Sequence, residues 1–186
     1  MAISSDEYLS ELLGRYQANF DITKDFTLGD KTYPAYAWFF SFGEKYVLKK
    51  EAQLWAIRAY EHVLFIKTDM VSKDLLQEIR QTIEDHVEPE LVRRGEKYPE
   101  KDHMCTYMTF VIISDRTPDK ELQKEIKRFK YDKGYLFNFR GHSEGKLACA
   151  CLDSKEVFTN YSGKELKELL TDIFKTQRGT KEEKVS

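Results

Sequence analysis

MCTYMTFVIISDRTPDKELQKEIKRF, residues Met104 to Phe129, is the stretch that decides the fold of this chain. Its first half carries no charge before Asp115 and is rich in β-branched and aromatic side chains, which is typical of a strand buried on both faces. Its second half begins with Thr117 as a candidate N-cap and Pro118 at the first helical position, an order that favours a helix. The stretch therefore predicts a central strand followed by a helix, around which the other segments pack.

The segments on either side show helix and strand patterns in turn. Apolar side chains spaced three and four residues apart predict amphipathic helices, and apolar runs or alternations predict strands. Pro89 lies inside the longest helical pattern and predicts a break or kink between His86 and Pro89. The expected helices cover 5–17, 72–95, 117–129 and 162–176, the last with a capping box of Ser162 and Glu165. The expected strands cover 20–28, 36–42, 45–50, 54–57, 63–66, 104–114, 135–139, 146–152 and 157–159.

Residues 52–68 leave two alternatives open. The apolar runs 54–57 and 63–66 predict two strands, joined as a hairpin. A helix over residues 52–60 competes with this interpretation, because alanine, leucine and arginine favour helices.

Together these elements predict an α+β fold for a single domain over residues 1–176. A mixed or mostly antiparallel sheet of about six to eight strands is expected to be covered by about four helices, in the layered packing of small domains. The polar residues 177–186 are expected to form a disordered C-terminal tail. The length of 186 residues and the hydrophobic content of 41% fit one domain with a sizeable core.

Composition and charge narrow the class of protein. The net charge of −2 does not support binding of the chain as a whole to nucleic acid or to an anionic membrane. No apolar run predicts a transmembrane segment, and the first residues lack the apolar core of a signal peptide. Cys105, Cys149 and Cys151 lie in apolar strand patterns, where reduced, buried thiols and no disulfide are expected. We therefore expect a cytoplasmic protein without a membrane partner.

Asp69 and Asp115 are the best-placed pair of polar residues. Each follows an apolar strand pattern and precedes a predicted helix. If the two strands are parallel neighbours, both carboxylates lie at the carboxyl ends of strands, where ligands bind in open α/β sheets, and could hold Mg²⁺. The alternative is structural, because backbone amides at a helix start also stabilise an aspartate.

The segment Arg140 to Glu144 gathers a guanidinium, an imidazole, a hydroxyl and a carboxylate within five residues. His142 could act as a general base and Arg140 could bind an anion. The alternative is a hairpin connection, since Gly134 is predicted to start a hairpin and glycine, serine and charged residues are common in turns. In that hairpin, Tyr135, Phe137 and Phe139 would share one face of the first strand and could line a small-molecule site.

Two short motifs, Pro118-Asp119 and Asp153-Ser-Lys155, resemble the carboxylate and Asp/Glu-x-Lys elements of metal-dependent nucleases of the restriction-endonuclease-like family. The resemblance implies a mixed sheet flanked by helices, carboxylates that hold Mg²⁺, and a lysine that orients the attacking water. The chain departs from the family pattern at both motifs. Pro118-Asp119 opens a predicted helix and Asp153 lies in a predicted turn, so no residue role is carried over.

The residues leave three hypotheses for function. The first is a binding or interaction domain without catalytic activity, and the aromatic segment Tyr33 to Phe42 would allow a homodimer if one of its faces were exposed. The second is an Mg²⁺-dependent hydrolase that uses Asp69 and Asp115, with Mg²⁺ as its one implied cofactor. The third is the small-molecule site at Tyr135, with Arg140 or His142 at its mouth. The sequence alone does not decide the function.

Overall fold

The computed structural model describes residues 3–44 and 56–182, and the side chains of 3–40 and 59–176. Its helices are α1 (Ser5–Tyr16), α2 (Lys73–Thr82), the π-helix η1 (Ile83–Val92), α3 (Lys120–Arg128) and α4 (Leu166–Glu182). Its strands are β1 (Asp21–Leu28), β2 (Lys31–Glu44), β3 (Ala56–Met70), β4 (His103–Arg116), β5 (Asp132–Gly134), β6 (His142–Cys151) and β7 (Glu156–Thr159).

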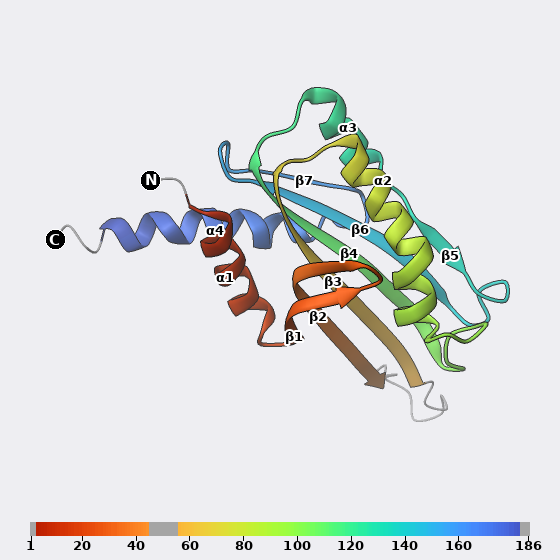
Figure 1. The fold of residues 1–186 in the computed structure, drawn as a ribbon. Helices are drawn as coiled ribbons and strands as arrows, with labels where there is room; N and C mark the ends of the chain where they lie inside the picture. Colours follow the sequence, from red (N-terminus) through yellow and green to blue (C-terminus); the bar gives the residue numbers. More distant parts are fainter. Residues whose placement is uncertain (1–2, 45–55, 183–186) are drawn as a thin grey trace.

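All seven strands form one mixed sheet in the order β1-β2-β3-β4-β6-β5, with β7 also pairing with β6. The first three strands form an antiparallel meander, in which a turn at residues 29–30 joins β1 to β2. Strands β3, β4 and β6 are parallel, and β5 and β7 run antiparallel to β6. This arrangement confirms the predicted single α+β domain (Figure 1).

Helices cover both faces of the sheet. Figure 1 shows α1 and α4 on one side and α2 with α3 on the other. Each pair buries its own apolar cluster, one around Leu12 and Phe65 and the other around Ile79 and Phe110. The central strand β4 contributes to both clusters, which explains why it carries no charge between Met104 and Ser114. No helix in the part of the chain that the structure describes is long and apolar enough to cross a membrane.

The prediction of a hairpin between 54–57 and 63–66 was wrong for the residues that the structure describes. Ala56–Met70 is one strand of 15 residues, and residues 56–60 are not helical. It pairs with β2 on one side and with β4 on the other, and this pairing outweighs the helix preference of its alanines. The expected strand 45–50 and residues 52–55 lie outside the described residues.

The predicted break near Pro89 takes the form of a change in helix type. Ser72 is the N-cap of α2, because its hydroxyl accepts a hydrogen bond from the amide of Leu75 at 3.1 Å. From Ile83 the chain continues as η1, which contains Pro89. The wider π-helical turn, in which Arg93 N donates to Glu88 O at 3.0 Å, accommodates a proline that lacks an amide donor.

Two predicted helix starts were wrong. Asp119, and not Thr117, caps α3 by accepting a hydrogen bond from the amide of Leu122 at 2.9 Å. The capping box at residues 162–165 does not form, because both side chains contact groups on other elements. Helix α4 starts at Leu166 and runs to Glu182, so residues 177–182, expected in a disordered tail, continue the helix.

The predicted strand 135–139 is a turn. Leu136, Phe137 and Asn138 have positive φ angles of 47°, 50° and 69°, a left-handed conformation that costs about 1–2 kcal/mol per residue. The three rings expected on one face are separated: Tyr135 is buried, whereas Phe137 and Phe139 are 97% and 85% exposed. They do not line one pocket, which removes the basis of the small-molecule hypothesis.

Candidate functional site

Strands β2, β3, β4 and β6 are in register, so residues at equal height form rows across the sheet. Under α1 and α4 the rows are apolar, and they become polar toward the amino ends of the parallel strands. The apolar row is Ala35, Phe65, Val111 and Ala148, and the next is Ala37, Val63, Thr109 and Lys146. The first polar row contains Glu61, Tyr107 and Glu144, and the second contains Cys105 and His142. We call these five residues the open face.

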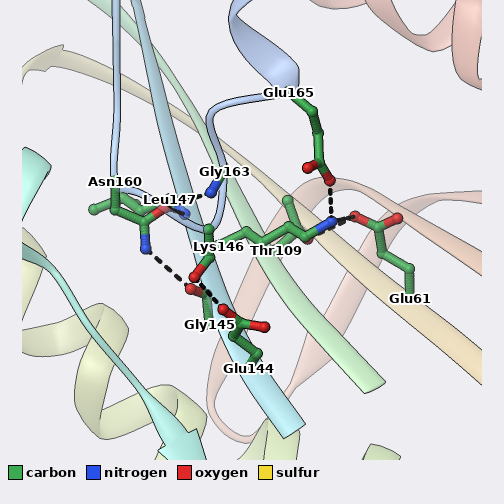
Figure 2. A network of polar contacts seen from close by, with 10 residues as sticks. Glu61, Thr109, Glu144, Gly145, Lys146, Leu147, Asn160, Gly163 and Glu165 are labelled. Atoms are coloured by element: carbon green, nitrogen blue, oxygen red, sulfur yellow. Dashed lines mark hydrogen bonds and ion pairs between the residues drawn. The ribbon is translucent and has the colours of Figure 1, made fainter. Parts of the chain in front are cut away.

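Lys146 is a buried cation at the border of the open face, with a side chain only 5% exposed. Its ammonium group pairs with the carboxylate of Glu165 and lies 3.8 Å from Glu61 (Figure 2). The nitrogen also lies 3.7 Å from the centroid of the Tyr107 ring, and the Thr109 hydroxyl donates to Glu61 at 2.8 Å. Lys146 is therefore balanced by two carboxylates and held by an aromatic ring.

Asn160 fixes the turn that brings α4 to this place, and its side chain uses its full hydrogen-bonding capacity. Figure 2 shows it beside Gly145, Leu147 and Gly163. Its amide oxygen accepts from the backbone amides of Leu147 and Gly163, both at 2.9 Å. Its amide nitrogen donates to the carbonyls of Gly145 at 3.0 Å and Phe129 at 3.1 Å. Asn160 thereby anchors the turn directly before Glu165 to β6.

Glu144 is the second carboxylate of the open face and, like Glu61, is half-buried. Its carboxylate accepts a hydrogen bond from the Ser162 hydroxyl. In the described part of the chain it has no ion pair with a cation, in contrast to Glu61 and Glu165. The carboxylates of Glu61 and Glu165 balance the charge of Lys146, whereas the carboxylate of Glu144 is left over, and this excess negative charge is suited to a cationic group.

Cys105 and His142 are register partners on β4 and β6. The Cys105 sulfur lies 3.4 Å from Nε2 of His142. Burial raises the pKa of the Cys105 thiol to about 11, with the charge of Glu144 adding to the effect. The thiol is therefore protonated at neutral pH, which is unlike an activated nucleophile.

We expect Cys105 to alkylate slowly. A shift of the thiol pKa from 9.0 to about 11 lowers the thiolate fraction at neutral pH about 100-fold, and burial slows access further. Iodoacetamide labelling followed by peptide mass spectrometry should show this slow reaction in the native chain and a fast one in urea. Equal rates of Cys105 labelling in the native chain and in urea would contradict a buried thiol with a raised pKa.

The candidate residues Arg140 and Tyr135 lie at the same end of the sheet but have structural partners. The Arg140 guanidinium donates to the carbonyl of Pro99 at 3.0 Å. The Tyr135 hydroxyl donates to Glu88 and contacts the Ser143 hydroxyl, both at 2.9 Å. Of the three predicted binding residues, only His142 belongs to the open face.

Asp69 and Asp115 lie at the opposite end of the sheet. The parallel pairing of β3 with β4 places them at adjoining positions, as the sequence analysis required. Asp69 is paired with the guanidinium of Arg116, however, and Asp115 is exposed. Among the described residues no group of three or more His, Cys, Asp and Glu side chains could hold a metal ion. This arrangement offers no positive support for the Mg²⁺ hypothesis.

The carboxylates of the nuclease-like motifs serve the local backbone. Asp119 caps α3, and Asp153 accepts hydrogen bonds from the amide of Thr117 at 3.1 Å and from its hydroxyl at 2.6 Å. The hydrogen bonds from Thr117 hold the pKa of Asp153 below its ordinary value. Lys155 lies in the same turn as Asp153, with a positive φ of 60°. Asp153 lies in a turn as the sequence predicts, whereas Asp119 is the N-cap in place of Thr117.

Comparison with known proteins gives a family. A family model described as Domain of unknown function (DUF8052) matches residues 4–172. The chain belongs to this family. Comparison with curated proteins and with solved structures gave no match. The DUF8052 description assigns no activity, in agreement with the sequence analysis, which left the function open. The DUF8052 match includes all residues of the open face.

Glu61, Lys146 and Asn160 were not identified from the sequence, and Glu144 was named only as the carboxylate of the segment Arg140 to Glu144, without a role of its own. The sequence of this DUF8052 member does contain one signal for Glu144 and Lys146. The two residues stand at alternate positions of an apolar strand pattern, which places them on the same face of the strand. The partners Glu61 and Glu165 come from β3 and from the start of α4, and no local pattern links them.

Proposed function

We propose that this chain is a binding domain without catalytic activity, and that its open face takes a ligand with an amine or guanidinium group. The observation that carries the proposal is the half-buried carboxylate of Glu144, which lacks an ion-pair partner among the described residues. A cationic group of the ligand would form the ion pair that the carboxylate of Glu144 lacks.

The neighbours of Glu144 support binding better than catalysis. Tyr107 is its register partner and offers a half-exposed ring and a hydroxyl. Cys105 is a protonated thiol and provides no nucleophile at neutral pH. Lys146 is buried and engaged by the carboxylates of Glu61 and Glu165. The face thus combines negative charge, one aromatic ring and hydrogen-bonding groups, a set that recognises organic cations.

Thermal unfolding with and without agmatine, spermidine and glutarate tests the proposal. The two amines should raise the melting temperature, because a ligand at about 100 times its Kd adds about 2.7 kcal/mol to the stability of the native state. Glutarate, which carries the opposite charge, should have no effect. Glu144→Gln should abolish the rise, since it removes the charge and preserves the shape.

Glu168→Gln is the matched control, because Glu168 is an exposed carboxylate on α4 and the charge change is the same. It should retain the response to the amines. If the amines give no rise in the wild type, or give equal rises in the wild type and Glu144→Gln, the proposal fails.

A further inference from the structure

The turn between β5 and β6 carries the most exposed large apolar side chains in the described part of the molecule. Phe137 is 97% exposed and Phe139 is 85% exposed, and Leu136 beside them is 39% exposed. Met104, whose carbonyl lies against Gly141 at the base of the turn, is 46% exposed. We call these four side chains the aromatic tip. Figure 1 shows the turn protruding from the end of the sheet beyond β5.

The aromatic tip stands on a rigid base. Tyr135 N donates to Gly141 O at 3.0 Å and Arg140 N donates to Tyr135 O at 3.1 Å, which closes the turn. The ring of His103 donates from Nδ1 to the carbonyl of Arg140 at 2.7 Å. Gly141 has a φ of 75° and lies so close to the carbonyl of Met104 that a Cβ atom would clash with it. These contacts maintain a left-handed turn that presents two phenyl rings to solvent.

The size of the aromatic tip favours a lipid surface over a second protein. Two nearly free phenylalanine side chains offer roughly 350 Å² of surface, given about 150–250 Å² for each aromatic residue. A stable protein interface needs about 800 Å² from each partner, so the aromatic tip by itself is too small for a dimer. A bilayer requires no matching surface, and protruding rings can enter its interfacial layer.

The charge around the aromatic tip is also suited to an anionic surface. Segment 130–140 contains the turn, and segment 93–102 contacts it through the hydrogen bond from Arg140 to Pro99. The two segments contain seven basic and four acidic residues, and the carboxylate of Glu88 pairs with Arg93 and Lys133. With Glu88 included the local net charge is +2, whereas the whole chain has a net charge of −2. Basic groups beside inserted apolar side chains are attracted to anionic headgroups.

We propose that the aromatic tip docks this domain onto an anionic lipid surface, with Phe137 and Phe139 entering the interface. The proposal is independent of the amine site on the open face. The expectation of no membrane partner rested on the charge of the whole chain and on the lack of a long apolar run. Neither feature bears on insertion by two side chains.

Vesicle sedimentation with the full chain tests the proposal. The wild type should sediment with vesicles of phosphatidylcholine mixed with phosphatidylglycerol, more weakly with phosphatidylcholine alone, and less at high salt. The double variant Phe137→Asn/Phe139→Ser should bind at least about tenfold more weakly, because it removes both rings. Asparagine is chosen at position 137 because it tolerates a positive φ.

Tyr161→Ser is the matched control, since Tyr161 is an aromatic residue that is 78% exposed outside the turn. It should bind vesicles as the wild type does, and all variants should keep the wild-type melting temperature. The proposal is overturned if the wild type stays in the supernatant with phosphatidylglycerol vesicles. It is equally overturned if the folded double variant binds as tightly as the wild type.

Discussion

Asn160→Ala is expected to lower the free energy of unfolding by about 4 kcal/mol, because it leaves several buried backbone groups without a partner at once. Asn160 is 1% exposed, and its side chain makes four hydrogen bonds to the backbone. Alanine would remove the partner of all four backbone groups, of which those of Gly145, Leu147 and Gly163 are buried and that of Phe129 is partly buried. Urea denaturation of the two proteins should show a lower midpoint with an unchanged slope.

Asn19→Ala provides the control, since Asn19 is exposed and the same atoms are removed. Its effect should stay within about 0.5 kcal/mol, as is usual for surface substitutions. A loss of less than about 1 kcal/mol in Asn160→Ala would mean that water takes over the hydrogen bonds, and the role of Asn160 as an anchor would be disproved.

Glu88→Gln is expected to lower the free energy of unfolding by about 3 kcal/mol near neutral pH, because removing one member of a buried charge cluster leaves the others uncompensated. Glu88 is 2% exposed within η1. Its carboxylate accepts two hydrogen bonds from Arg93, at 2.6 and 3.1 Å, and lies 3.1 Å from the ammonium of Lys133. The Tyr135 hydroxyl completes the cluster and connects it to the aromatic tip.

The effect of Glu88→Gln should depend on pH. Burial raises the pKa of Glu88, but the hydrogen bonds from Arg93, Tyr135 and Lys133 outweigh burial and hold the pKa below its ordinary value of 4.5. A carboxylate with a lowered pKa in the folded state stabilises the fold above its unfolded pKa, and this stabilisation is lost as the pH falls through the folded value. The stability difference between the wild type and Glu88→Gln should therefore narrow below about pH 4.5.

Urea denaturation at neutral and acidic pH measures this difference, with Glu84→Gln as the control. Glu84 is an exposed carboxylate in the same π-helix and should have little effect at either pH. A constant difference between the wild type and Glu88→Gln across the pH range would show that the loss arises from packing and not from charge.

Much of the fold could be predicted because its signals are local. The uncharged run before Asp115 predicts β4, since a strand with helices on both faces excludes charge. The helical patterns predict α1 and α2, where apolar spacing and a serine cap agree. Local signals failed where tertiary contacts compete for the same side chain. Thr117 is a reasonable cap by sequence, but its hydroxyl contacts Asp153, a residue of the turn between β6 and β7.

The candidate site was predicted only in part, because its members are distant in the sequence. His142 was identified from its polar neighbours, and the structure places it beside Cys105 on the adjacent strand. The pairing of Lys146 with Glu61 and Glu165 depends on strand order and on the position of the last helix. Neither is determined by apolar periodicity, which reports which face of an element is buried and not which element it meets.

The sequence by itself determined the α+β class, the central strand and most of the helices, because burial patterns and capping residues act over a few positions. The tertiary structure alone decided the parallel pairing of β3, β4 and β6, and with it the open face. It also decided the left-handed turn at Phe137, where contacts from η1 and β4 through Tyr135 and Arg140 outweigh the local strand preference. The physical reason is the same in both cases: these features depend on interactions between residues far apart in the chain, and local preferences of about 1 kcal/mol are too small to oppose them.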